Sequence, residues 1–204
     1  MDLLKKSFYE TYTKDLTSLI SSELSGDNWK LASACLQASE EPFDPDYHTT
    51  EKAKEDATLL WKGKGKWFGT DEKEIFKVLV LSPPNYLDMI NKLYAEIYGY
   101  TLLKAMEKQL AGNARKATLF HLKMKLQPYY AVAELIKSAC AGIGTNELLL
   151  TTCIIRYQDV LGRVNLAHEE LYGKSIHDRV RGECSGNYKA LLLALVDKLC
   201  PETI

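Results

Sequence analysis

The chain has 204 residues, 46% of them hydrophobic, and a formal net charge of −1 at pH 7. That content allows a sizeable buried core, and the near-zero charge excludes the global basic field that drives nucleic-acid binding. No run approaches the roughly 18 apolar residues of a membrane-spanning helix. The five cysteines lack paired spacing and the first residues are too polar for a secretory signal, so we expect a cytosolic protein with reduced thiols.

Apolar residues fall at helical spacing along almost the whole chain, and no segment is predicted as a strand. Residues 1–37 match only the later helices of a repeating unit, and residues 38–48 are predicted to be a linker because they hold prolines and acids. A first full unit follows over residues 49–124 and a second over residues 127–200. Each should contain an entry helix, a loop, a second helix, a long third, a short fourth and a capped fifth. The fold class is all-α.

Residues at the ends of these helices support the same division. Pro84 suits the first turn of a helix, because proline has a fixed φ and needs no amide partner there. Gly99 and Gly173 each follow a long helix, where glycine commonly ends it. Thr101 and Ser175 then stand where a side-chain oxygen would cap the start of the short fourth helix.

Two short elements recur along the chain. The pentapeptide ELSGD at 23–27 returns as QLAGN at 109–113 and as ECSGN at 183–187. A glycine loop, GTDE at 69–72 and GTNE at 144–147, precedes the last two copies by nearly equal distances of 40 and 39 residues. Each unit thus joins a glycine loop to a distant position that is acidic in two of three copies. That pattern is typical of an oxygen-lined cation site.

These features resemble the annexins, membrane-binding proteins built from four repeats of five helices. The resemblance rests on the Gly-x-Gly-Thr loop at 142–145, the element at 183–187, the ending at 188–193, and the longer tryptophan-bearing loop at 63–70, which is similar to the loop of the third annexin repeat. It covers nearly the whole chain and implies right-handed superhelical repeats. The chain resembles the end of repeat two plus repeats three and four, so the usual N-terminal half is missing.

The resemblance implies a calcium site in the second full unit. In annexins, three loop carbonyls, a distant acid, and water or lipid phosphate surround the ion. Carried over to this chain, Cys140, Gly142 and Gly144 supply the carbonyls and Glu183 supplies the acid. A single carboxylate leaves a divalent ion under-neutralised, so an anionic lipid headgroup would complete the site and calcium would bridge loop and membrane. The alternative is that the loop is only a helix cap with a glycine stop.

The corresponding site in the first full unit is the weaker candidate. Gly63, Trp67 and Gly69 could offer carbonyls, but Gln109 stands where the acid is expected, and a neutral amide oxygen is a poorer calcium ligand. Glu23 matches the acidic position in the partial unit. Its partner loop is absent, so we expect a solvated carboxylate there.

Side chains at the tips of the two loops are candidate membrane contacts. Tryptophan favours the membrane interface, and lysines near anionic headgroups contribute about 1 kcal/mol each. The alternative for the longer loop is that one aromatic ring packs beneath it as core. The candidate contacts are Lys64, Lys66, Trp67, Phe68 and Ile143.

Three classes of function remain to be weighed. The leading interpretation is calcium-dependent binding to acidic phospholipids such as phosphatidylserine, on the cytoplasmic side of membranes. The second is a calcium-independent scaffold that binds cytoskeletal or other partners or self-associates, which Gln109 and the missing half favour and Glu183 opposes. The third, an enzyme, is not expected, because we find no nucleotide loop, nucleophile elbow or paired-carboxylate signature, and the four histidines lack metal-ligand spacing.

Overall fold

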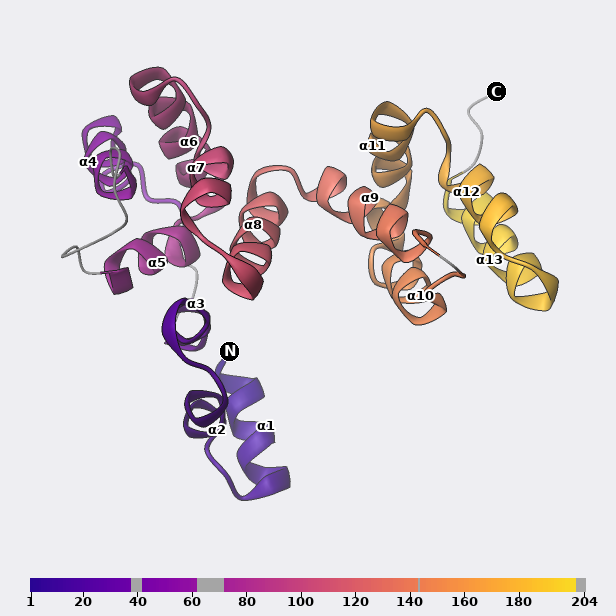
Figure 1. The fold of residues 1–204 in the computed structure, drawn as a ribbon, viewed down its shortest axis with the longest axis horizontal. Helices are drawn as coiled ribbons and strands as arrows, with labels where there is room; N and C mark the ends of the chain where they lie inside the picture. The colour runs from indigo at the N-terminus through magenta and orange to yellow at the C-terminus, as the bar shows by residue number, and fades with distance from the viewer. Residues whose placement is uncertain (38–41, 62–71, 143, 201–204) are drawn as a thin grey trace. The chain divides into compact units, whose positions relative to one another are not determined.

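The computed structural model places helices throughout the chain (Figure 1). It describes residues 1–37, 42–61, 72–142 and 144–200. Within these ranges there is no strand, and the all-α prediction is confirmed. The chain divides into two compact units, 1–126 and 127–204, and each is described here by itself. The residue limits assigned to the repeats from the sequence stay predictions.

In its described residues the first unit holds a group of three helices followed by a group of five. The fifth helix of the larger group begins at the glycine of the recurring pentapeptide, as the last helix of the smaller group does. In chain order the helices are α1 (Asp2–Tyr12), α2 (Leu16–Glu23), α3 (Gly26–Gln37), α4 (Thr50–Leu60), α5 (Glu72–Leu81), α6 (Pro84–Tyr98), α7 (Leu102–Gln109) and α8 (Gly112–Leu126).

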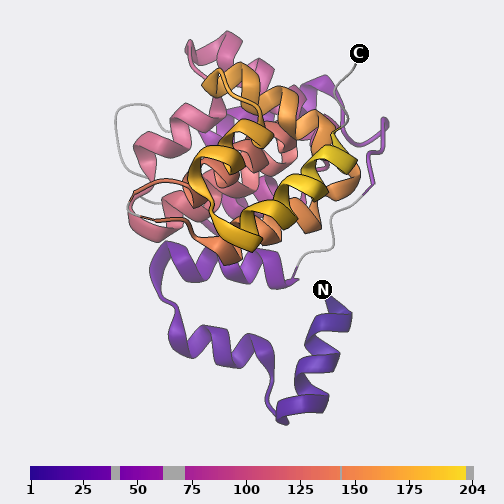
Figure 2. The same cartoon turned by 90° about the vertical axis from the view of Figure 1, so that its right-hand side faces the viewer.

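The second unit, drawn from orange to yellow in Figure 2, repeats the order of α4 to α8 with one short addition. A single 3₁₀ turn, η1, precedes its long third helix. The elements are α9 (Pro128–Ala139), α10 (Glu147–Arg156), η1 (Gln158–Val160), α11 (Leu161–Tyr172), α12 (Ile176–Glu183) and α13 (Gly186–Leu199).

Each unit encloses an apolar core of its own. In the first unit α4 packs along α6 and α3 along α5, and the side chains between them include Leu60, Ile75, Phe76, Leu87 and Ile90. In the second unit α9 packs against α10 and α11 over Ile136, Leu150, Ile154, Leu161 and Val164. Fully burying one such side chain stabilises the fold by about 1.5–3 kcal/mol relative to leaving it in water. These cores hold the helix ends, and therefore the loops, in place.

The predicted ends of the long third helices and starts of the short fourth helices are confirmed. Gly99 and Gly173 have φ of 78° and 64°, in the left-handed region that favours glycine. The Thr101 and Ser175 side chains accept hydrogen bonds from amides three residues on, at 3.3 and 2.9 Å. The sequence did not predict a second contact at each of these helix starts. The side chain of an asparagine in the long third helix accepts a hydrogen bond from the first amide of the short helix. Asn91 does so in the first unit at 3.0 Å, and Asn165 in the second at 2.8 Å.

Candidate metal site and its surroundings

The loop between α9 and α10 is closed by its own backbone. The Asn146 amide donates to the Ala139 carbonyl at 2.7 Å, and the Asn146 side chain accepts from the Leu149 amide at 3.0 Å, capping α10. Between these bonds, Gly142 and Gly144 have φ of 94° and 85°. Side chains with a Cβ rarely adopt such angles, so both positions require glycine. The chain can therefore reverse its direction tightly at this point.

Three carbonyls of this loop have capacity to bind a cation. Among hydrogen bonds between described residues, none is accepted by the carbonyls of Cys140, Gly142 or Gly144. Burial, with smaller contributions from the nearby Cys184 and Glu183, raises the pKa of the Cys140 thiol to about 11. The thiol is therefore protonated at neutral pH. The main-chain oxygen of Cys140, rather than its sulfur, is the group suited to a hard cation.

Side-chain hydrogen bonds bring Glu183 to this loop from the end of α12. The Thr145 hydroxyl donates to the main-chain oxygen of Glu183 at 2.9 Å, across 38 residues of sequence. Just beyond, the Tyr188 hydroxyl donates to the Glu147 carbonyl at 3.0 Å and lies 2.9 Å from the Thr151 hydroxyl. The junction of α12 and α13 is thus fastened to the loop and to the first turns of α10. The glycine loop and the acidic position, paired by spacing alone, lie side by side.

The Glu183 carboxylate is partly exposed and has a cationic neighbour that sequence reasoning missed. Its side chain is 40% exposed, and one oxygen lies 3.8 Å from Nη1 of Arg179, whose own side chain is only 7% exposed. Comparing the two full units would have signalled this arginine, because the position four residues before Gln109 is Ala105. The site therefore combines three loop carbonyls that accept no hydrogen bond from described residues, one carboxylate and one buried guanidinium.

Of the candidate ligands of the weaker site, Gln109 alone lies within the described residues. Gly63, Lys64, Lys66, Trp67, Phe68 and Gly69 lie outside the described residues, as does Ile143 of the other loop. The side-chain oxygen of Gln109, at the end of α7, is buried and has no hydrogen-bond partner among the described residues. Leaving such an oxygen unpaired costs about 1–3 kcal/mol, so the position is suited to a ligand or donor. Glu23, at the end of α2, is exposed, in keeping with a solvated carboxylate.

Within the part of the chain that the structure describes, no three His, Cys, Asp or Glu side chains gather as a metal-ligand group. The donor set that fits a cation is the mixed one of loop carbonyls and Glu183, which suits calcium because calcium accepts backbone oxygens in irregular geometry. No described helix has both the length and the apolar character to cross a membrane.

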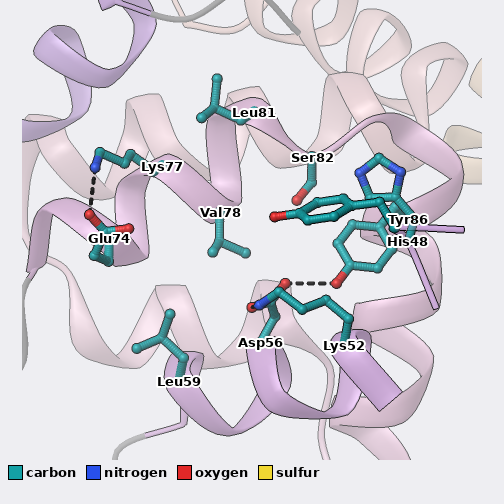
Figure 3. A pocket seen from close by; sticks show the side chains of 11 residues that line it. His48, Lys52, Asp56, Leu59, Glu74, Lys77, Val78, Leu81, Ser82 and Tyr86 are labelled. Atoms are coloured by element: carbon teal, nitrogen blue, oxygen red, sulfur yellow. Dashed lines mark hydrogen bonds and ion pairs between the residues drawn. The ribbon is translucent and has the colours of Figure 1, made fainter. Parts of the chain in front are cut away.

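A separate polar pocket of about 260 Å³ lies in the first unit, beside α4 and α6 (Figure 3). Asp56 accepts from the Tyr86 hydroxyl at 2.7 Å and contacts the Lys52 ammonium at 2.6 Å. His48 Nδ1 accepts from the Asp44 amide at 2.9 Å, and its ring centroid lies 4.5 Å from that of Tyr86.

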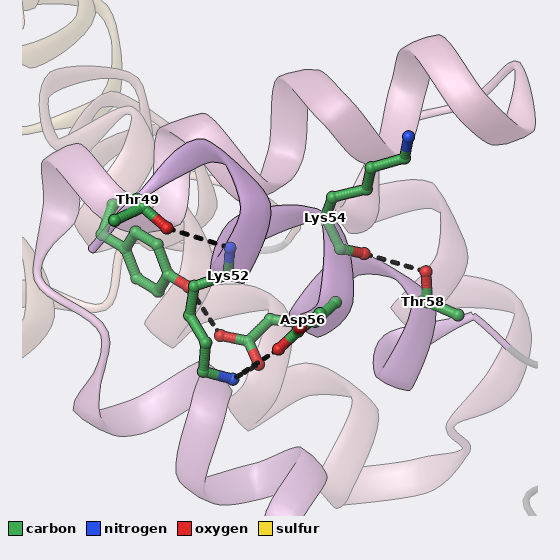
Figure 4. Close-up of polar contacts among 7 residues, drawn as sticks. Thr49, Lys52, Lys54, Asp56 and Thr58 are labelled. Atoms are coloured by element: carbon green, nitrogen blue, oxygen red, sulfur yellow. Dashed lines mark hydrogen bonds and ion pairs between the residues drawn. The ribbon is translucent and has the colours of Figure 1, made fainter. Parts of the chain in front are cut away.

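The charges of this pocket are satisfied within the protein. Figure 4 shows two contacts of Lys52: its amide donates to the Thr49 hydroxyl oxygen, and its ammonium pairs with the Asp56 carboxylate. Burial and the bond to Asp56 raise the pKa of Tyr86 well above its usual range, so the phenol stays a donor. The cluster fastens the segment before α4 to α6, a structural role.

Comparison with known proteins identifies the family to which this fold belongs. The family model described as Annexin matches residues 55–120 and 131–195, more than half of the chain. The chain belongs to the annexin family. The resemblance seen in the sequence is thereby confirmed, and so is the annexin-like fold class.

Individual annexins match nearly all of this chain. Annexin A13 of Schistosoma japonicum is 30% identical over 213 residues, and annexin A7 of Dictyostelium discoideum is 28% identical over 199. These matches cover 94% and 96% of this chain but 60% and 42% of the relatives, so the chain spans about half the length of the curated relatives it matches.

Solved annexin structures have the same fold. Annexin III matches with a TM-score of 0.80 and 26% identity, covering 94% of this chain and 59% of that one. A structure described as calcium-bound annexin (Sm)1 matches with a TM-score of 0.76 and 25% identity, covering 95% of this chain and 57% of that one.

Proposed function

We propose that this annexin-family chain binds acidic phospholipid membranes in a calcium-dependent manner. The proposed ligands are the carbonyls of Cys140, Gly142 and Gly144 and the carboxylate of Glu183. One observation carries the proposal: the Thr145–Glu183 hydrogen bond brings the acid to a loop whose three carbonyls accept no bond from described residues. The calcium-bound state described for annexin (Sm)1, a structural relative, supports the choice of ion.

The chemistry of this donor set explains why lipid is part of the proposal. A bound calcium ion would supply two positive charges, against one carboxylate from the protein. The loop residues orient neutral oxygens, and Glu183 supplies the only anion of the set. Anionic headgroup phosphates would add the missing negative charge, so calcium and membrane should bind together. We further propose that Lys64, Lys66, Trp67, Phe68 and Ile143 contact the membrane surface.

We propose a non-enzymatic protein of the cytoplasmic side that lies peripherally on membranes when calcium is present. The Gln109 position is proposed as a second, weaker calcium site, because its buried amide oxygen lacks a partner among described residues. A calcium-independent scaffold, with cytoskeletal partners or self-association, is the alternative that the amide favours.

Vesicle sedimentation tests the proposal directly. The chain is mixed with vesicles of phosphatidylserine and phosphatidylcholine in calcium, and a parallel sample receives EGTA. We expect sedimentation with calcium, release by chelator, and none with pure phosphatidylcholine. Binding that persists in EGTA would favour the scaffold, and no binding in either condition would refute membrane attachment.

A further inference from the structure

A charged side chain is buried inside the second unit next to the proposed site. Arg179, on α12 one turn before Glu183, is only 6% exposed. Its guanidinium carbon lies 5.7 Å from the centre of the Tyr172 ring, and Nη1 lies 3.8 Å from a Glu183 carboxylate oxygen. A guanidinium stays charged at any physiological pH, and burying it is costly unless partners surround it.

His168 holds this arginine from the other side. His168 is fully buried on α11, and its Nδ1 lies 2.6 Å from the Lys174 carbonyl, so that nitrogen carries the proton and donates. Nε2 is then the acceptor, and it receives the Nε–H of Arg179 at 3.1 Å. Burial lowers the pKa of His168, in keeping with a neutral ring at pH 7. The guanidinium is thereby fixed between a histidine and the end of α12.

The other full unit shows that the fold itself does not need this pair. Its equivalents of His168 and Arg179, placed by the shared helix-ending glycines, are Tyr94 and Ala105, both buried. The same unit has Gln109 where the second has Glu183. Between the two full units, the arginine is therefore present with the acid and absent with the amide, whereas the partial unit has Leu19 four residues before Glu23. The 3.8 Å contact between Arg179 and Glu183 ties this arginine to the carboxylate.

We propose that Arg179 is an internal counter-charge for Glu183. The carboxylate must turn away from this guanidinium before it can bind calcium, so Arg179 sets the affinity of the site. The inference rests on the proposed calcium site. The guanidinium cannot lose its proton, and His168 keeps it near, so it also repels an incoming cation. Weak binding without lipid, and a strong need for an anionic headgroup, follow from this arrangement.

The test compares calcium affinity without lipid in the parent chain and in Arg179→Met, which keeps the apolar stem and removes the charge. Because an ion pair with a partly exposed partner contributes modestly, we expect about threefold to tenfold tighter binding by calorimetry. Arg181→Met is the matched control. Arg181 lies on the same helix and pairs with Asp178 at 3.4 Å, so its loss removes equal charge without freeing Glu183.

A second variant is needed in case Arg179→Met alone fails to fold. Arg179→Met alone leaves the buried His168 acceptor unpaired, whereas His168→Phe with Arg179→Met removes both polar partners together. Both versions should bind calcium more tightly than the parent. A measurement in EGTA tests the interaction between Arg179 and Glu183 without any metal. Under this condition, Arg179→Met should lower the Tm less in a Glu183→Gln background than in the parent.

The outcomes separate this inference from the proposed function. If the parent binds calcium through Glu183 and both Arg179 variants bind it equally or more weakly, the inference is overturned and the calcium site stands. Additive Tm changes in EGTA would overturn it as well. If neither parent nor variants bind calcium, the proposed site fails and the inference falls with it. Tighter binding in both variants, but not in Arg181→Met, supports the inference.

Discussion

Thr145 donates its hydroxyl to the main-chain oxygen of Glu183 at 2.9 Å, which fastens the α9–α10 loop to the end of α12. Thr145→Val keeps the shape of the side chain and removes the donor. We expect a loss of about 0.5–1.5 kcal/mol in the free energy of unfolding and weaker calcium binding, because the acid is no longer held at the loop. Urea unfolding and calcium titration measure the two effects. Thr145→Ser, which keeps the hydroxyl, should restore both, and a Val variant with parental affinity would show that the bond does not position the ligand.

Glu183→Gln should weaken calcium-dependent vesicle binding more than any other single acidic substitution. The change keeps the oxygen and removes the only anion of the proposed set. Sedimentation across a calcium titration measures it, with Asp178→Asn, an exposed acid on the same helix, as control. Coinciding curves for Glu183→Gln and the parent would remove Glu183 from the ligand set.

Gln109→Glu should strengthen calcium binding in the first unit. The Gln109 oxygen is buried and unpartnered among described residues, so a carboxylate there would be costly without a cation and favourable with one. We expect a lower Tm in EGTA than the parent and a larger rise on adding calcium. Calorimetry should show a higher affinity or an increased stoichiometry. The same stoichiometry and affinity before and after substitution would mean that the preceding loop cannot gather its carbonyls.

Trp67 fluorescence should shift to shorter wavelength when calcium and phosphatidylserine vesicles are both present. A ring moving from water into the headgroup region loses polar relaxation around its excited state. Trp29 and Trp61 would obscure the signal and should first be changed to phenylalanine. Phenylalanine suits position 61, because the indole there stacks on Tyr98 at 4.8 Å between centroids. A Trp67 that is already blue-shifted in the free protein and does not respond would be a core residue.

Asp56→Ala should destabilise the first unit by about 2–3 kcal/mol, because the buried Tyr86 hydroxyl loses its acceptor. Asp56→Asn keeps an oxygen for that bond and should cost less. Urea unfolding followed by circular dichroism measures both. Vesicle binding should be unchanged if the pocket is structural, whereas a parallel loss of binding would give it a further role.

The sequence predicted most reliably what is decided locally. Gly99, Thr101, Gly173 and Ser175 ended and began helices as expected, because positive φ and side-chain capping depend on a few neighbouring residues. The internal repeat paired the glycine loop with Glu183 across a long separation, and the hydrogen bond from Thr145 bears out their proximity.

Contacts between different helices were the part that could not be read in advance. The Asn91 and Asn165 bonds have no local signature, because an asparagine in a helix looks like any solvated polar residue. Arg179 was not singled out from the sequence, because its burial against His168 depends on a contact between two helices. The ligand roles of all the named residues, and the membrane contacts, stay predictions.

Helix α12 is held at both of its ends. At its start the Ile176 amide is bound to Asn165 at 2.8 Å, and at its finish Glu183 is bound to Thr145 at 2.9 Å. Its eight residues form a segment of about 12 Å between two fixed points. Inserting a single residue would turn the carboxylate by about 100° and lengthen the span by about 1.5 Å, so both attachments could not be kept. The two attachments therefore constrain the number of residues in this helix more strongly than the side chains on its exposed face.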